Sequence, residues 1–205
     1  MDQTPLKFPD FDFAAGELLL INKPYKWTSF DVVGKIRNSL KPLKLKVGHA
    51  GTLDPLATGL LIICTGKFTK QINDYMGMIK EYTGSLVLGA TTASYDLEQE
   101  PENFKSIDSI TASKILETTQ QFIGTIFQLP PQHSAIKKDG KRLYESARQG
   151  IEVKVDPRQI TIETFEITKI ELPVLHFRVV CSTGTYIRSL AHDYGKALGC
   201  GAYLS

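Results

Sequence analysis

Residues 160–181 have the sequence ITIETFEITKIELPVLHFRVVC, a pattern typical of paired β-strands. Its apolar side chains occupy even positions at 160 and 162, odd positions at 165 and 167, and even positions again at 170 and 172. Because the side chains of a strand alternate between two faces, each change of phase needs a bulge, a bend or a break. From Leu175 to Cys181 the odd positions then form one apolar stripe. We therefore predict strands that bury one face.

The regions around this stretch alternate between helix and strand patterns. A turn at 182–184 leads into a helix predicted over Tyr186–Leu198 and ended by Gly199. Further helices are predicted over Thr28–Leu40, around 68–76, and over Thr111–Phe122, the last with Ile115, Leu116, Thr119 and Phe122 facing inward. Strands are predicted at 17–22, 60–64 and 82–88. This interspersed order, with short joins between the later strands, predicts an α+β fold with a mixed, largely antiparallel sheet flanked by helices.

Length and composition narrow the class of protein. The chain has 205 residues, 42% of them hydrophobic, which is enough for one domain over 1–205 to fold without a disulfide or a metal. No apolar run approaches the roughly 18 residues of a membrane span. The three cysteines are odd in number and form no C-x-x-C pair, which favours a reducing compartment. We therefore expect a cytoplasmic protein with no membrane partner.

Charge is unevenly distributed although the net charge is only +2. Two regions are basic: the first contains Lys35, Arg37, Lys41, Lys44 and Lys46, and the second contains Lys137, Lys138, Lys141, Arg142 and Arg148. Acids collect between 96 and 108. This asymmetry suits a basic face for a phosphate backbone, but on charge alone an ordinary exposed surface is the simpler interpretation of each cluster. The second cluster lies in segment 129–158, which is polar and poorly periodic, as in a long loop or flap.

The strongest chemical signal is GHAGTLDPLATGLL at Gly48–Leu61. Three glycines and a proline surround one carboxylate, Asp54, between two predicted strands. Glycine permits sharp turns and close approach of a ligand, and proline fixes the residue after the acid. Asp54 could therefore be a rigidly held catalytic group, or it could only stabilise its own turn.

A second signal is STGTYIRSL at 182–190. Arg188 falls in the first turn of a predicted helix, where the helix dipole disfavours a cation. A specific acidic partner would explain it, although a solvated surface arginine is the simpler interpretation. If the partner is Asp54, the pair would hold the pKa of Asp54 below its ordinary value and keep that carboxylate ionised, as a nucleophile or base requires.

Other chemistries lack their motifs. The sequence has no P-loop, no dinucleotide-binding glycine fingerprint and no nucleophile elbow. It also has no H-E-x-x-H motif or paired-cysteine ligand set, so we expect no metal site.

The Asp54 motif resembles the catalytic-aspartate motif of the TruB family of tRNA pseudouridine synthases. Four further stretches resemble the family in the same order: 20–24, 80–82 with the strand after it, 132–150 and 184–190. The resemblance extends from about Leu18 to Ser205. The continuation Leu56-Ala57-Thr58-Gly59 is similar to the stand-alone bacterial type rather than to the guide-RNA-dependent relatives.

The resemblance implies a pseudouridine synthase-like fold and isomerisation of uridine 55 in the T loop of tRNA, without a cofactor. Asp54 matches the essential aspartate, which either attacks the nucleotide or removes a sugar proton before the uracil detaches, rotates and rejoins through carbon. Tyr82 matches the tyrosine that stacks on the target base, and Arg188 matches the arginine that pairs with the aspartate. Read without the resemblance, Tyr82 could simply pack in a strand.

The resemblance also implies how RNA is bound. Extruding a base costs a few kcal/mol, which stacking and phosphate contacts must offset. His49 matches a histidine near the flipped bases, Lys23 matches a lysine that supports the site, and Asp96 matches a further polar residue nearby. Without the resemblance, His49 could be a turn residue and Lys23 a surface charge. The flap at about 129–158, with Lys137, Lys138, Lys141 and Arg142, is implied to be a basic RNA-clamping flap that closes on the T arm.

We expect a monomer whose partner is tRNA. Two other functions remain open: a tRNA-binding and folding factor with secondary catalysis, and a catalytically silent RNA-binding module. Family members continue past the position of Ser205, so the resemblance also implies that a C-terminal RNA-binding domain is absent from this chain.

Overall fold

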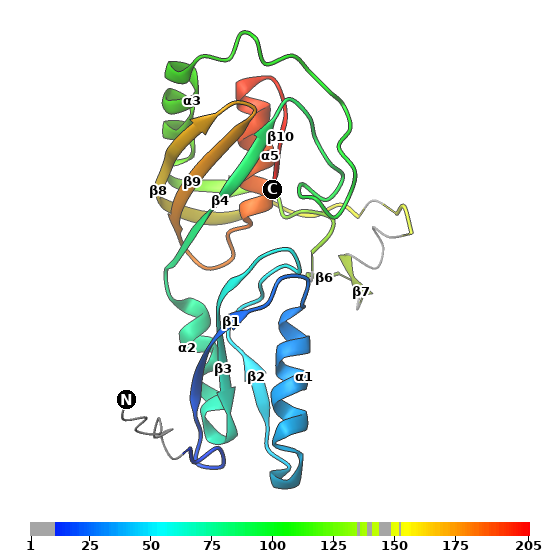
Figure 1. The fold of residues 1–205 in the computed structure, drawn as a ribbon, viewed down its shortest axis with the longest axis vertical. Helices are drawn as coiled ribbons and strands as arrows, with labels where there is room; N and C mark the ends of the chain where they lie inside the picture. The colour runs from blue at the N-terminus through cyan, green and yellow to red at the C-terminus, as the bar shows by residue number, and fades with distance from the viewer. Residues whose placement is uncertain (1–10, 135, 139–140, 144–148, 152) are drawn as a thin grey trace, which may run out of the picture. The chain divides into compact units, whose positions relative to one another are not determined.

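The computed structural model describes residues 11–134, 136–138, 141–143, 149–151 and 153–205, with only the backbone at 137, 138, 141 and 142. The chain packs as two compact units, Met1–Met78 and Ile79–Ser205 (Figure 1). Each unit has a hydrophobic core of its own. None of the helices in these described ranges is long and apolar enough to cross a membrane.

The first unit is built on a three-stranded antiparallel sheet in the order β1-β3-β2. β1 spans Leu18–Lys23, β2 Val47–His49 and β3 Gly59–Thr65. Helix α1, Ser29–Ser39, contributes Val32 and Val33 to the same core as Leu61 and Ile63 of β3. A short 3-10 turn follows α1 at Lys41–Leu43, and the unit ends with a 3-10 turn at Gly66–Gln71 and helix α2 at Ile72–Gly77.

Helix α1 begins where the sequence predicts. Thr28 is its N-cap: the Thr28 hydroxyl accepts a hydrogen bond from the Asp31 backbone N–H, and the Asp31 carboxylate accepts one from the Thr28 backbone N–H. This reciprocal capping box satisfies two backbone donors that the first turn would otherwise leave unpaired. The helix predicted around 68–76 is only partly confirmed, because its first half is a 3-10 turn.

The second unit contains a five-stranded antiparallel sheet in the order β10-β4-β9-β8-β5 (Figure 1). The strands are β4 Lys80–Leu88, β5 Gly124–Gln128, β8 Arg158–Glu171, β9 Val174–Cys181 and β10 Ala202–Leu204. Two helices pack on one face of this sheet and contribute to the core of the unit: α3, Ala112–Thr119, and α5, Ile187–Leu198. A 3-10 turn, Gln120–Phe122, follows α3. The predicted α+β class is therefore confirmed.

The phase changes predicted in 160–172 are present as irregularities within one long strand. The pairing of β8 with β9 shifts register between Ile162 and Thr164 and again between Ile167 and Lys169. On β9, residues 175, 177, 179 and 181 are all buried, as the apolar stripe predicts. The register shifts keep the apolar side chains of β8 on the core face although their spacing in the sequence changes.

One inward-facing prediction on α3 is wrong. Ile115 and Thr119 are buried, but Leu116 is 50% exposed. The buried face follows positions 115, 118 and 119, and Leu116 lies about 100° around the helix from Ile115. Leu116 therefore faces away from the core.

Cys64, Cys181 and Cys200 are buried free thiols, and the last two belong to the core of the second unit. None of the three takes part in a disulfide.

Candidate active site

Asp54 lies in the loop 50–58, which joins the antiparallel neighbours β2 and β3 of the first unit. The Ala57 backbone N–H donates to the Asp54 carbonyl at 3.0 Å, so Asp54-Pro55-Leu56-Ala57 is a hydrogen-bonded β-turn with proline at its second position. Gly51 and Gly59 flank the turn with φ of +100° and +115°, values that side-chain-bearing residues rarely adopt. These glycines let the chain leave one strand, form the turn and enter the next.

Two side chains outside the loop fix its backbone. The Ser29 hydroxyl, in the first turn of α1, lies 3.0 Å from the Leu53 backbone N–H and 3.2 Å from the Leu53 carbonyl. On the other side of Asp54, the Pro55 carbonyl accepts hydrogen bonds from the Lys26 backbone N–H at 2.8 Å and from Lys23 Nζ at 3.2 Å. Asp54 is therefore held between two anchored neighbours.

Lys23 is fully buried, so the interpretation of Lys23 as a surface charge is wrong. Its ammonium group donates to three carbonyls, those of Pro24, Trp27 and Pro55, at 2.5–3.2 Å. An ammonium group has three protons, so these contacts satisfy all of its donors. Burial lowers the pKa of Lys23, and the negative charges of Asp54 and Asp31 oppose that shift. Lys23 thus places a positive charge close enough to Asp54 to interact with it.

His49 is the last residue of β2, and its side chain is half-buried beside the same loop. His49 Nδ1 is hydrogen-bonded to the Gly51 carbonyl. The loop therefore brings together three of the predicted site residues, Lys23, His49 and Asp54.

The second unit holds the other predicted residues. Tyr82 lies on β4 opposite Val179 of β9, and its half-buried ring packs at the margin of the core. Arg188 is the second residue of α5. Gln128 fixes the start of that helix, because its amide oxygen accepts from the Tyr186 backbone N–H at 2.8 Å and its NH₂ donates to the Tyr186 carbonyl at 3.1 Å.

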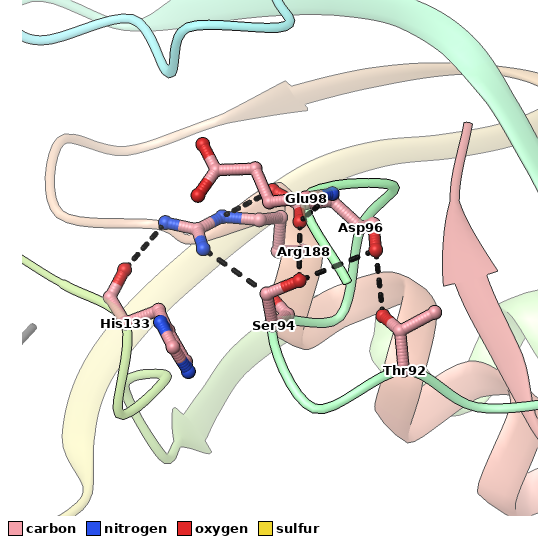
Figure 2. Close-up of polar contacts among 6 residues, drawn as sticks. All are labelled: Thr92, Ser94, Asp96, Glu98, His133 and Arg188. Carbon is pink, nitrogen blue, oxygen red and sulfur yellow. Dashed lines mark hydrogen bonds and ion pairs between the residues drawn. The ribbon is translucent and has the colours of Figure 1, made fainter. Parts of the chain in front are cut away.

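Arg188 is almost completely buried. Its guanidinium is held by three residues, Ser94 and Asp96 from one segment and His133 from another (Figure 2). Its Nη1 donates to the Ser94 carbonyl at 3.2 Å and its Nη2 to the His133 carbonyl at 3.0 Å. Its Nε lies 3.6 Å from the Asp96 carboxylate, which is equally buried. The interpretation of Arg188 as a solvated surface residue is wrong, and the acidic partner within the second unit is Asp96. Its pairing with Asp54 stays a prediction.

Asp96 is itself fixed by its neighbours in the segment 92–98. One carboxylate oxygen accepts from the Ser94 hydroxyl at 2.6 Å and from the Glu98 backbone N–H at 3.0 Å. The Asp96 carbonyl accepts from the Thr92 hydroxyl at 2.7 Å. Sequence reasoning placed Asp96 near the site but missed its pairing with Arg188. The alternation of Thr92, Ser94 and Asp96 is the signal that could have indicated an ordered polar turn.

The four basic residues of the predicted flap are described only by their backbone. β6, Lys137–Lys138, pairs with β7, Lys141–Arg142, as a small antiparallel hairpin. Their side chains lie outside the described residues, as does most of the short helical piece that the sequence predicts at Arg142–Gln149.

Comparison with known proteins gives one family. The model of the TruB family pseudouridylate synthase, N-terminal domain, matches residues 37–187. A tRNA pseudouridine synthase B from Flavobacterium johnsoniae is 55% identical over 199 residues, covering 95% of this chain and 87% of the relative. The protein of the same name from Parabacteroides distasonis is 52% identical over 197 residues, covering 94% of this chain and 84% of the relative.

Solved structures agree with the fold. A chain of a Cbf5–Nop10–Gar1 complex aligns with a TM-score of 0.70 at 30% identity, over 94% of this chain and 47% of the other. A chain of an H/ACA RNP bound to a substrate RNA containing 2′-deoxyuridine aligns with a TM-score of 0.65 at 27% identity, over 100% of this chain and 53% of the other.

Proposed function

Because this chain belongs to the TruB family of pseudouridylate synthases, we propose that it isomerises a uridine of tRNA to pseudouridine. The target we propose is uridine 55 in the T loop, with the T arm as the part of tRNA that is bound. The relatives that are named tRNA pseudouridine synthase B and share half or more of their residues with this chain support the substrate class.

The observation that carries the proposal is the anchored turn at Asp54. Both neighbours of Asp54 are fixed by hydrogen bonds: Leu53 is bonded to Ser29 of α1, and Pro55 is bonded to Lys23 of β1 and to the backbone of Lys26. The carboxylate therefore has a rigid support. A group that must meet one atom of an extruded nucleotide gains rate from such positioning.

We assign the chemistry to three residues. Asp54 acts on the nucleotide, either as a nucleophile or as the base that removes a sugar proton. Tyr82 stacks on the target base and assists proton transfer, and Arg188 supplies positive charge to the reacting groups. The reaction breaks and remakes a bond to one uracil within the site, so we propose that it uses neither a cofactor nor a metal.

The remaining predicted residues have two kinds of role. His49 stacks on bases of the opened loop, while Lys137, Lys138, Lys141 and Arg142 contact phosphates from the flap. Lys23 and Asp96 are positioning residues, because their described contacts are with protein groups. Through these contacts Lys23 supports the Asp54 turn and Asp96 supports Arg188. We propose that the chain acts as a monomer in the cytoplasm.

The first test replaces the central carboxylate. Asp54→Asn keeps the size of the side chain but removes its charge, so we expect pseudouridine formation in an unmodified tRNA transcript to be abolished. Affinity for the transcript should stay within a few-fold. Chemical mapping of pseudouridine measures the first quantity, and filter binding measures the second.

Asp74→Asn is the matched control, because Asp74 is an exposed acid of α2, and it should convert the transcript at the normal rate. Measurable turnover by purified Asp54→Asn would remove Asp54 from the mechanism. A transcript left unmodified by the wild-type chain under the same conditions would overturn the proposed activity itself.

A further inference from the structure

Helix α1 carries an open groove on the side that faces away from its core. The groove has a volume of about 530 Å³. It is lined from α1 by Phe30, Asp31, Gly34, Lys35 and Asn38, and from the preceding loop by Lys26 and Trp27. The helix positions recur every three to four residues, so they lie along one side of α1, while Val32 and Val33 on the other side enter the core.

Three aromatic rings are exposed at the groove and beside it. Tyr25 is 56% exposed, Trp27 38% and Phe30 62%. A single exposed aromatic residue is ordinary, but three within six positions form an apolar patch of the kind that marks an interaction site.

The charge around these rings is positive. The Lys26 ammonium lies 5.6 Å from the centre of the Tyr25 ring, and the Arg37 guanidinium lies 5.6 Å from the centre of the Phe30 ring. Lys35 lines the groove itself. The one acid there, Asp31, accepts hydrogen bonds from the backbone N–H and hydroxyl of Thr28 in the capping box. The Asp31 carboxylate is therefore occupied at the helix terminus. The lysines leave the groove with a net positive charge, which favours an anion.

Two residues of the groove, Lys26 and Gly34, are unfavourable for the stability of the folded chain. Lys26 has a φ of +65°, a left-handed conformation that is unfavourable for a residue with a long side chain. Gly34 lies in the middle of α1 with open space where a Cβ would be, although alanine would stabilise the helix. The missing side chain leaves open space along the groove at this position.

We propose that this groove binds unpaired nucleotides of the RNA substrate, with bases stacking on Trp27 and Phe30 and phosphates contacting Lys26 and Lys35. Exposed aromatic rings interleaved with cations are the arrangement by which proteins hold single-stranded nucleic acid without reading its sequence. The proposal rests on the proposed function, since it takes RNA as the substrate. It adds a contact surface on α1 beyond the Asp54 turn, which the groove adjoins because the Lys26 backbone N–H donates to the Pro55 carbonyl.

Trp27 is the only tryptophan of the chain, so its fluorescence reports on this groove directly. The wild-type chain is titrated with an unmodified tRNA transcript, a short oligouridylate, a blunt RNA duplex and polyglutamate. We expect the transcript and the oligouridylate to quench the emission, more weakly as salt is raised, and the duplex to leave it unchanged. Unchanged emission at transcript concentrations where filter binding detects the complex would overturn the proposal.

Two variants test the groove by opposite means. Phe30→Ala removes a stacking surface and should weaken oligouridylate binding about tenfold. Phe104→Ala, which removes an exposed phenylalanine of the second unit, should not. Gly34→Leu fills the groove with a good helix former, so it should raise the melting temperature while lowering affinity. A Gly34→Leu variant that binds as tightly as wild type would contradict the groove as the binding site.

The remaining outcomes separate the groove from its alternatives and from the enzyme activity. Quenching by polyglutamate as strong as by oligouridylate would assign the groove to an acidic protein and overturn the RNA proposal. Normal pseudouridine formation without any change in Trp27 emission would refute the groove and leave the proposed function intact. Quenching without pseudouridine formation would refute the function and leave the groove.

Discussion

At the scale of single residues, Arg188 and Asp96 form an ion pair that is almost completely buried. Taking both charges out of water costs free energy. Their attraction offsets this cost, together with the hydrogen bonds that Asp96 accepts from Ser94 and Glu98 and the one that Arg188 donates to the His133 carbonyl. Removing one partner leaves the other as a buried charge without its counterion. The two side chains are therefore coupled, and substitutions at one of them also test the other.

We predict that Asp96→Asn and Arg188→Gln each lower the free energy of unfolding by about 3–5 kcal/mol. The double variant should lose clearly less than the sum, because it buries neither charge. Urea denaturation of all four chains measures this coupling.

The exposed pair Lys169–Glu171, 2.7 Å apart, is the matched comparison. Its coupling should stay below about 1 kcal/mol, because solvent screens it. Strictly additive losses at positions 96 and 188 would contradict the buried pair.

The sequence predicted part of this residue-scale picture. The position of Arg188 at a helix N-terminus left two interpretations open, a specific acidic partner or a solvated surface arginine, and Asp96 is such a partner. The partner was missed because Asp96 belongs to an acid-rich stretch that has the composition of a solvated loop. Composition does not show the local turn in which Thr92 and Ser94 donate to Asp96, and the contact of Asp96 with Arg188 depends on tertiary structure.

At the scale of elements, two helical glycines have opposite surroundings. A Cβ at Gly195 of α5 would lie 2.1 Å from the Ala202 backbone nitrogen and 2.4 Å from the Gly201 carbonyl carbon. The Gly201 backbone N–H also donates to the Gly195 carbonyl at 3.0 Å. Gly195 therefore lets β10 lie directly against α5, whereas a Cβ at Gly34 of α1 would meet open space.

We predict that Gly195→Ala destabilises the protein by about 1–3 kcal/mol or more, because a backbone segment has to move. Gly34→Ala should stabilise it by about 0.5–1 kcal/mol, because alanine restricts the unfolded chain and suits the helix. Both values follow from urea denaturation. Equal effects of the two substitutions would show that the α5–β10 contact does not limit the side chain at 195.

Most elements could be predicted from periodicity, and the ones that could not were short. β8, β9, α1 and α5 have long patterns that bury one face, and they form where the sequence indicates. β10 has three residues and β5 has five, and both are edge strands of their sheet. Three to five residues are too few to show a clear period. Each of these strands forms because it pairs with β4 or β8, which is distant in sequence.

At the scale of the whole molecule, the chain packs as two units although the sequence predicts one domain. The division falls between Met78 and Ile79, at the end of α2 and just before β4. No run rich in glycine, proline or charge marks this point, so composition gave no linker signal. That the whole chain forms one catalytic domain stays a prediction.

Global stability should depend on pH through a half-buried histidine of α5. Burial lowers the pKa of His192 from its ordinary value of 6.5, and the charge of Lys196 lowers it further. The contribution of neutral His192 is complete above pH 6.5. As the pH falls below 6.5, the unfolded chain takes up a proton before the folded chain does, so stability declines until the folded pKa is passed.

We predict that His192→Phe, which preserves an aromatic ring against Tyr95, reduces this decline between about pH 7.5 and 5.5. Thermal melts at several pH values measure it. Asp193 acts in the opposite sense at lower pH, because burial raises its pKa and the folded chain then takes up the proton first. An unchanged pH profile in His192→Phe would contradict the role of His192.

The buried cysteines determine how the chain can be labelled. Burial raises the pKa of all three thiols, and the thiolate is the reactive form, so the native chain should be inert toward maleimide at neutral pH. A cysteine introduced at an exposed position such as Phe127 would then be the single site of modification. Dyes or spin labels can therefore be attached without first removing any native sulfur.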